Sequence, residues 1–274
     1  MKITDISLLS EYQKIIGNTL TLGLERFDWL WDTTLEYLTQ TGAVYSSNIE
    51  WNTLDVNSFM NHEIYEKKSE KSRDVEEINN LIEAYEFAQQ NPLTEVNILH
   101  CHQLASRTLL IESKQGKYRE EKVGVFGSSG LIYLAVEHEK VSELMRELFA
   151  GIEQLTSLPV KVGWRRPGGS IEANNIDELK SDIDKIFYHA SLLHLVFAHI
   201  HPFADGNGRL ARLLEKWFLA TIGGEKYWRI PSEQYYKEHR PEYYNNINLW
   251  VNFYELDYSK ALPFLGMLAK SVIK

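Results

Sequence analysis

The segment 181–200 (SDIDKIFYHASLLHLVFAHI) constrains the fold most. From Ile186 onward, apolar side chains fall on nearly every face of a helix drawn through it. A helix of that kind has to be surrounded by other elements, so the segment predicts a central helix in a mostly helical domain. The segment 209–222 (RLARLLEKWFLATI) also has helical spacing, and we expect it to be the packing partner.

Helical spacing recurs along most of the chain. It predicts helices over residues 74–90, with Asp74 as N-cap, and over 97–110, 139–155, 26–40 and a short piece at 46–50. The expected fold class is therefore mostly α.

One segment, 123–136 (VGVFGSSGLIYLAV), departs from the helical pattern. Two β-rich runs, Val123–Phe126 and Leu131–Leu134, flank a turn at Gly127–Gly130 and predict a hairpin. A lone two-stranded hairpin is marginal in water, so it should rest on the helices, either as surface decoration or as a working part. Residues 157–180 are rich in Pro, Gly and Asn, and we interpret them as an inserted loop.

Charge and composition narrow the function classes. Lys and Arg number 29 against 38 Asp and Glu, a net charge of −9, which argues against non-specific nucleic-acid binding. The single cysteine, Cys101, suits a reducing compartment and has the setting of a small buried residue. The start of the chain lacks signal-peptide features, and no apolar run approaches the roughly 20 residues of a membrane helix. We expect a cytoplasmic protein that binds neither nucleic acid nor membrane.

The stretch 201–212 (HPFADGNGRLAR) has the composition of a phosphate site. Pro202 disfavours helical geometry at His201, so the central helix should end there. The Gly-Asn-Gly at 206–208 tolerates positive φ, and its successive N–H groups can form an anion-binding nest. The dipole of the following helix would add to the attraction.

The remaining polar residues of the stretch fit the same chemistry. Arg209 and Arg212 are one helical turn apart and can grip phosphate oxygens. Asp205 would repel phosphate unless Mg²⁺ lay between them. His201 has the ordinary pKa of a general base near neutral pH. A Gly-Asn-Gly turn or an exposed arginine pair is common alone, but the ordered combination is typical of phosphate handling.

This stretch resembles the signature of Fic-domain proteins, HPFx(D/E)GNGRxxR, at every fixed position. HLVFAHIHPF resembles the helix leading into that signature, GKYREEKVGV the segment before the family's flap, and RPEYYNNI its tyrosine-bearing helix. The resemblance covers roughly residues 74–258 without the loop at 157–180. It implies a Fic-type helical bundle with a small β-hairpin flap. We expect an N-terminal helical region over 1–70, and a Fic-like catalytic domain with C-terminal helices over 71–274.

The resemblance implies a protein adenylyltransferase that moves AMP from ATP to a Ser, Thr or Tyr hydroxyl, on an unidentified protein or on this chain itself. His201 would take the hydroxyl proton, and Asp205 would hold Mg²⁺ against the phosphates. The phosphates would be bound by the backbone of 206–208, the side chain of Asn207, and both arginines: Gly206, Asn207, Gly208, Arg209 and Arg212. Phe203 would be a buried anchor.

Two further elements gain roles from the resemblance. The hairpin would be a flap that pairs with an extended segment of the target, with Ile132 or Tyr133 pinning the target side chain. Tyr243 and Tyr244 are candidates for the adenine pocket, although a helical tyrosine is often only core.

The stretch 46–52 (SSNIEWN) resembles the family's inhibitory motif, (S/T)xxxE(G/N), from Ser46 to Glu50. In relatives with this motif, the glutamate pairs with the second arginine, here Arg212, and blocks productive ATP binding. Trp51 departs from the pattern, because Gly or Asn is usual there. The alternative is a surface helix capped by Ser46 or Ser47.

Other functions compete with this hypothesis. His194, His199 and His201 could join Asp205 in a Zn²⁺ hydrolase site, but His194 and His199 would point about 140° apart on a helix. A non-enzymatic, nucleotide-regulated binding module is a second alternative, and a family member that transfers another phosphate-containing group or removes AMP is a third. The sequence leaves open whether the chain forms a homo-oligomer.

Overall fold

The computed structural model describes residues 1–26, 33–65, 73–127, 130–157 and 176–273. The helices are α1 Leu9–Ile16, α2 Thr19–Arg26, α3 Leu35–Ile49, α4 Val56–Tyr65, α5 Arg73–Gln90, α6 Glu95–Ala105, α7 His138–Thr156, α8 Ile176–Ile200, α9 Asn207–Gly223, α10 Ser232–Glu238, α11 Arg240–Ile247 and α12 Leu262–Lys270. The strands are β1 Gly124–Gly127 and β2 Gly130–Leu134. Most of the expected inserted loop lies outside the described residues.

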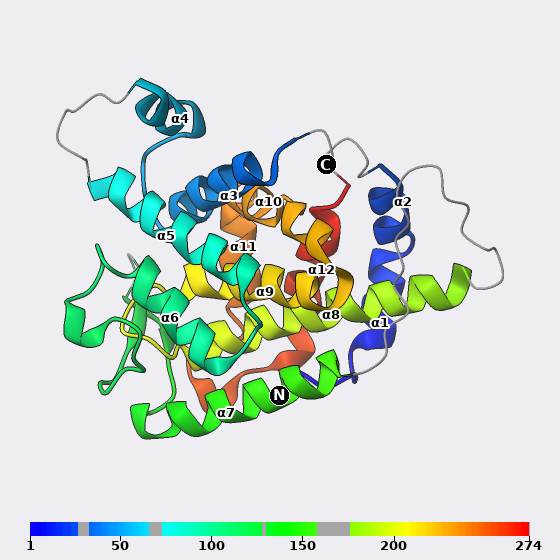
Figure 1. Ribbon diagram of the computed structural model, residues 1–274. Helices are drawn as coiled ribbons and strands as arrows, with labels where there is room; N and C mark the ends of the chain where they lie inside the picture. Colours follow the sequence, from blue (N-terminus) through cyan, green and yellow to red (C-terminus); the bar gives the residue numbers. More distant parts are fainter. Residues whose placement is uncertain (27–32, 66–72, 128–129, 158–175, 274) are drawn as a thin grey trace.

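Helix α8 is the central helix that the sequence predicts. It runs through the molecule (Figure 1) and packs most extensively on α9, with α1, α2, α7 and α12 also in contact. Its side chains are buried almost without interruption from Ile183 to Ile200. Among the described residues, no helix is long and apolar enough to cross a membrane.

Helix α3 corrects the prediction of two separate pieces at 26–40 and 46–50, although residues 27–32 of the first piece lie outside the described residues. It is one helix from Leu35 to Ile49, and Thr34 caps it by accepting a hydrogen bond from the Tyr37 N–H (3.2 Å). Residues 41–45 include weak helix formers, and helix propensity alone does not favour a continuous helix there. Packing decides otherwise, because α3 lies against α5 and α10 with Ala43 and Val44 fully buried.

Two predicted helix ends also differ from the structure. Helix α5 starts at Arg73, so Asp74 is inside the helix and not its N-cap. Helix α6 ends at Ala105 and not near 110, because the N–H groups of Leu109 and Leu110 bond to the Ser106 carbonyl in a separate turn.

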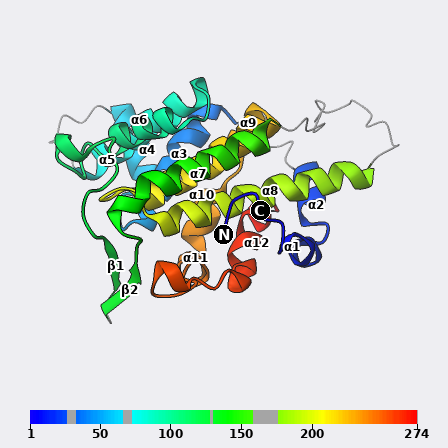
Figure 2. The ribbon, with the colours of Figure 1, turned by 90° about the horizontal axis from the view of Figure 1, so that it is seen from below.

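The predicted hairpin is present. β1 and β2 pair antiparallel, with Val125 opposite Tyr133 and a bulge between Val125 and Phe126. Figure 2 shows the hairpin extending away from the helices at one end of the bundle. The Leu134 N–H donates to the Val251 carbonyl (2.7 Å), so the base of the hairpin rests on the C-terminal segment.

The N-terminal region and the rest of the chain share one hydrophobic core. Ile3, Tyr12 and Val44 belong to the same buried cluster as Leu193 and Leu213 of the two central helices. Helix α3 also packs directly against α9, the helix that contains residues 207–212 of the signature.

Candidate functional site

The signature forms a short turn between α8 and α9. The first helix ends at Ile200, and the second begins at Asn207 with Gly206 as a left-handed N-cap (φ +81°). His201 lies outside the helix as expected, but its φ of +52° is left-handed and not the extended conformation usual before proline. Such a residue persists only where its surroundings hold it.

Arg119 supplies that support. Its buried guanidinium donates to the carbonyls of His201 (2.7 Å), Val136 (2.6 Å) and Ile200 (3.4 Å). Its backbone N–H donates to the Pro202 carbonyl (2.9 Å). Arg119 therefore satisfies carbonyls at the open end of α8 and fixes the turn. The segment GKYREEKVGV contains this residue, but sequence reasoning gave it no role.

The His201 ring is held by a backbone carbonyl of α8. Its Nδ1 lies 3.2 Å from the Ala198 carbonyl. Because a carbonyl only accepts, Nδ1 carries the proton and Nε2 keeps its lone pair. Burial lowers the pKa of His201 below its ordinary value, and the charge of Arg119 adds to this, against the Ala198 hydrogen bond and the carboxylates of Glu50 and Asp205. The neutral ring therefore predominates at pH 7.

His102 of α6 organises the middle of the turn, a role that the sequence did not reveal. Its ring stacks on Phe203 with centroids 3.7 Å apart. Nδ1 accepts from the Gly116 N–H (2.9 Å), so Nε2 donates to the Asp205 carbonyl (3.0 Å). Burial lowers the pKa of His102 to about 4, which keeps it neutral. Phe203 is fully buried, as expected of an anchor.

The Asn207 side chain has a different place from the one expected. Its amide nitrogen donates to the Phe203 carbonyl and its oxygen accepts from the Phe203 N–H, both at 2.9 Å. The side chain thus closes the turn from inside. Any phosphate contact from Asn207 is left to its backbone N–H in the first turn of α9.

Arg212 is fully buried and held by the end of α3. Its Nε donates to the Ser46 hydroxyl (2.9 Å), and its Nη2 donates to the Ser46 carbonyl (3.0 Å) and to Glu50 Oε1 (2.9 Å). The structure therefore brings together Ser46, Glu50 and Arg212, the three residues that the resemblance to the inhibitory motif relates.

The Glu50 carboxylate also lies in the predicted anion nest. A Cβ atom placed on Gly208 would come within 2.2 Å of Glu50 Oε1. Burial alone would raise the pKa of Glu50, but Arg212, Arg209 and Arg240 outweigh it and lower the pKa. An ionised carboxylate thus occupies the positive first turn of α9, where phosphate was expected.

Arg209 has its own acidic partner. Its Nη2 lies 2.6 Å from Oε1 of Glu77 on α5, and both side chains are largely buried. The two signature arginines are therefore engaged by different helices and do not project together into solvent. The helical spacing of 74–90 gave no sign that Glu77 would face the site.

The two candidate adenine residues differ in exposure. Tyr243 is buried, and its hydroxyl lies 3.3 Å from Arg212 Nη1 and 2.9 Å from His194 Nε2. Tyr244 is 38% exposed, and its hydroxyl donates to the Ile49 carbonyl (2.9 Å).

Several of these residues line a cavity of about 610 Å³, large enough for a nucleotide-sized ligand. Its walls come from the end of α3, the hairpin, the signature and α11, including Glu50, Ile132, His201, Gly208 and Tyr244. Tyr133 also borders it, but its hydroxyl donates to the His199 carbonyl (2.5 Å) and anchors the hairpin. Ile132 is 36% exposed, so it is the freer of the two flap candidates.

The zinc alternative finds no support in the geometry. The part of the chain that the structure describes contains no cluster of three or more His, Cys, Asp or Glu side chains suited to a metal. His194 lies between Glu215 (2.9 Å) and Tyr243, and His199 Nε2 lies 2.8 Å from the Ile247 carbonyl.

Asp205 is suited to a different metal. The residue is exposed, and one carboxylate oxygen accepts from the Gly206 N–H (2.6 Å). Mg²⁺ is commonly held by one or two carboxylates together with substrate phosphates and water, so this setting fits it.

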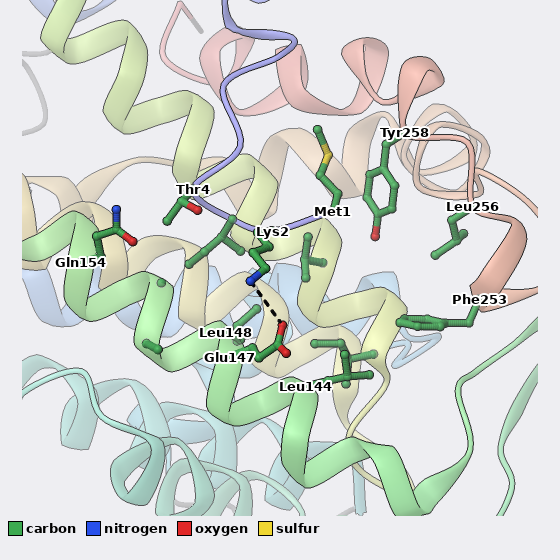
Figure 3. Close-up of a pocket in the computed structure, with 15 residues that line it drawn as sticks. Met1, Lys2, Thr4, Leu144, Glu147, Leu148, Gln154, Phe253, Leu256 and Tyr258 are labelled. Carbon is green, nitrogen blue, oxygen red and sulfur yellow. Dashed lines mark ion pairs between the residues drawn. The ribbon is translucent and has the colours of Figure 1, made fainter.

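A second cavity, of about 450 Å³, lies where the N-terminal residues meet α7 and the segment 253–258 (Figure 3). Its lining is mainly apolar, with Lys2 and Glu147 at 4.0 Å across it. No residue of the signature borders this cavity, so the candidate site is the first one.

Comparison with known proteins agrees with this choice. Residues 92–219 match the model of the Fic/DOC family. The chain is 33% identical over 98 residues to "Protein adenylyltransferase Fic" of Aedes aegypti, a match covering 33% of this chain and 18% of that protein. The similarity therefore spans under a fifth of the relative's length.

Solved structures share the fold. A Fic family protein from Desulfovibrio desulfuricans G20 superposes with a TM-score of 0.65 at 22% identity, covering 93% of this chain and 73% of that one. A Fic domain containing signaling protein from Bacteroides thetaiotaomicron superposes at 0.62 and 20% identity, covering 98% and 93%. Residues 92–219, a range that holds the signature but neither Glu50 nor α11, thus match the Fic/DOC family, and the chain shares the fold of these Fic structures.

Proposed function

We propose that this chain is a protein adenylyltransferase, which moves AMP from ATP to a hydroxyl side chain of a protein, and that Glu50 inhibits it. One observation carries the proposal: the ionised Glu50 carboxylate lies on Arg212 and against Gly208, in the same cavity as the neutral His201 ring. A nest that attracts an internal carboxylate is suited to a phosphate group. A neutral imidazole beside it is suited to removing a hydroxyl proton.

The proposed reaction uses the residues as follows. Nε2 of His201 takes the proton as the target oxygen bonds to the α-phosphorus, the bond from that phosphorus to the bridging oxygen breaks, and pyrophosphate leaves. The N–H groups of residues 206–208 and the side chains of Arg209 and Arg212 hold the phosphates. Arg212 does so only after Glu50 moves away, because one guanidinium cannot satisfy both anions.

Mg²⁺ is the proposed cofactor, and Asp205 would hold it. When bound, the ion would neutralise phosphate charge. Hydrogen bonds from the side chains of Arg119, His102 and Asn207 hold the backbone of the turn beside this carboxylate.

The hairpin is the proposed docking element for the target. A target segment would add along its edge and present its hydroxyl toward His201, with Ile132 beside it. Tyr243 and Tyr244 border the same cavity and are the proposed adenine neighbours. The target is another protein or a second copy of this chain, and the cytoplasm remains the predicted location.

The test is mass spectrometry of cell-lysate proteins incubated with Mg-ATP and the Glu50→Gly protein, with Glu50→Gly/His201→Ala as the matched control. The proposal expects AMP adducts on Ser, Thr or Tyr with the first protein and none with the second. Adducts of another mass would reveal transfer of a different group. ATP binding without any adduct would favour the binding module.

A further inference from the structure

Trp51, directly after Glu50, has an unusual backbone. Its φ is +72°, in the left-handed region that a bulky aromatic residue rarely adopts. The side chain is 76% exposed, so burial in the core does not offset the strain. Glycine is the usual residue at the position that ends a helix in this conformation. Some other contact must therefore hold Trp51 in place.

That contact is Arg240, the first residue of α11. Its guanidinium carbon lies 3.4 Å from the centroid of the Trp51 ring, within stacking distance. The Nε and Nη2 atoms of Arg240 are buried and have no hydrogen-bond partner among the described residues. Much of this guanidinium is therefore committed to the aromatic face and not to hydrogen bonds.

The same face of α11 also contacts Ile49 and Glu50, the two residues before Trp51. Tyr244, one helical turn after Arg240, donates from its hydroxyl to the Ile49 carbonyl (2.9 Å). That hydroxyl lies 3.5 Å from Glu50 Oε2. Arg240 and Tyr244 thus contact three consecutive residues, 49–51, at the end of α3.

We infer that Trp51, Arg240 and Tyr244 form a clamp whose role is to position the Glu50 carboxylate on Arg212 and Gly208. This inference rests on the proposed inhibition by Glu50. The strain in the Trp51 backbone favours movement of the end of α3 away from the nest, and stacking of Trp51 on Arg240 opposes this movement. When the stack is lost, the strain remains, and Glu50 should leave the nest more often.

The experiment measures AMP transfer and the ATP dissociation constant in Arg240→Gln, Trp51→Gly and the double variant. Arg240→Gln removes the stack and the positive charge near Glu50, and it keeps the strain. It should raise transfer about 2- to 30-fold, the range that a cation–π contact supports. Trp51→Gly alone removes both stack and strain and should stay close to the parent. In the double variant, transfer should return toward the parent, because glycine adopts positive φ without strain.

The Glu50→Gly background supplies the control. Arg240→Gln should add nothing there, because no carboxylate is left to position. Thermal unfolding checks that every variant is folded, and a Trp51→Phe protein, which keeps an aromatic face, should remain inhibited.

Two results would overturn the clamp: Arg240→Gln with parental transfer while Glu50→Gly is active, or an Arg240→Gln effect that Trp51→Gly does not reverse. If Glu50→Gly itself were no more active than the parent, the proposed inhibition would fail first, and the clamp with it.

Discussion

Replacing Glu50 by glycine removes a carboxylate that would compete with phosphate at two contacts. In the parent, Glu50 Oε1 accepts from Arg212 Nη2 at 2.9 Å and lies against Gly208, so it occupies both the cation and the nest that a phosphate would need. Under the proposed function, ATP would have to displace it. The ATP dissociation constant is therefore raised by the free energy that holds Glu50 in place.

The size of that free energy follows from the contact. The ion pair is partly buried, because the Arg212 side chain is fully buried and the Glu50 side chain is 27% exposed. A hydrogen bond between charged groups contributes about 1.5–3 kcal/mol. We therefore expect Glu50→Gly to bind ATP about 10- to 100-fold more tightly than the parent.

The assay is calorimetric titration with Mg-ATP, together with a measurement of AMP transfer. Transfer should rise with affinity, and Glu50→Gly/Arg212→Ala should lose the gain, because the freed arginine is what activates. Glu50→Gln keeps the length and removes the charge, so it should fall between parent and Glu50→Gly. Equal ATP affinity and equal transfer in parent and Glu50→Gly would refute the competition argument.

Three further predictions concern the rest of the site and the fold. In the Glu50→Gly background, His201→Ala should lower transfer by about 10²–10⁴-fold with little change in ATP affinity, and parental rates would remove His201 from the mechanism. Ile132→Gly with Tyr133→Gly should reduce transfer to protein targets more than ATP binding, and unchanged target use would leave the hairpin as scaffold. Burial lowers the pKa of His102 and of His199 to about 4 from an ordinary 6.5. Urea unfolding should therefore show a free energy of unfolding that falls as pH drops from about 6.5 to 4, by about 3 kcal/mol for each group. A His102→Gln protein should show a shallower decline, and a flat profile in the parent would contradict the buried neutral rings.

The sequence was informative where the chemistry is local. The turn between two helices and the left-handed Gly206 follow from neighbouring residues in HPFADGNGR, because proline and glycine act on adjacent backbone. The burial of Phe203 was expected only from the family resemblance. The central helix was predictable for a related reason, since apolar residues on all faces require burial.

Long-range partners were not predictable from spacing. Glu77 meets Arg209 across 132 residues, and Arg119 reaches the end of α8 across 82. Neither periodicity nor composition indicates which acid on a helix will face a distant arginine. The Glu50–Arg212 contact was anticipated only through the family resemblance.

Tertiary packing adds to or outweighs local preference at several positions. Pro202 predicts only that His201 is not helical, and its φ is left-handed because Arg119 and the end of α8 hold its carbonyl and N–H. The Asn207 side chain forms two hydrogen bonds to the Phe203 backbone, since the turn needs its own polar groups satisfied. Helix α3 continues through Gly42 because its middle is buried against α5 and α10.

The central claim is that the α-phosphate of ATP, and not the γ-phosphate, is transferred. Labelling with ATP that carries radioactive phosphorus at either position tests it directly, with the Glu50→Gly protein and cell lysate. Protein-bound label from the α-position only, abolished by His201→Ala, is the predicted result. Label from the γ-position, or α-label that persists without His201, would contradict the account.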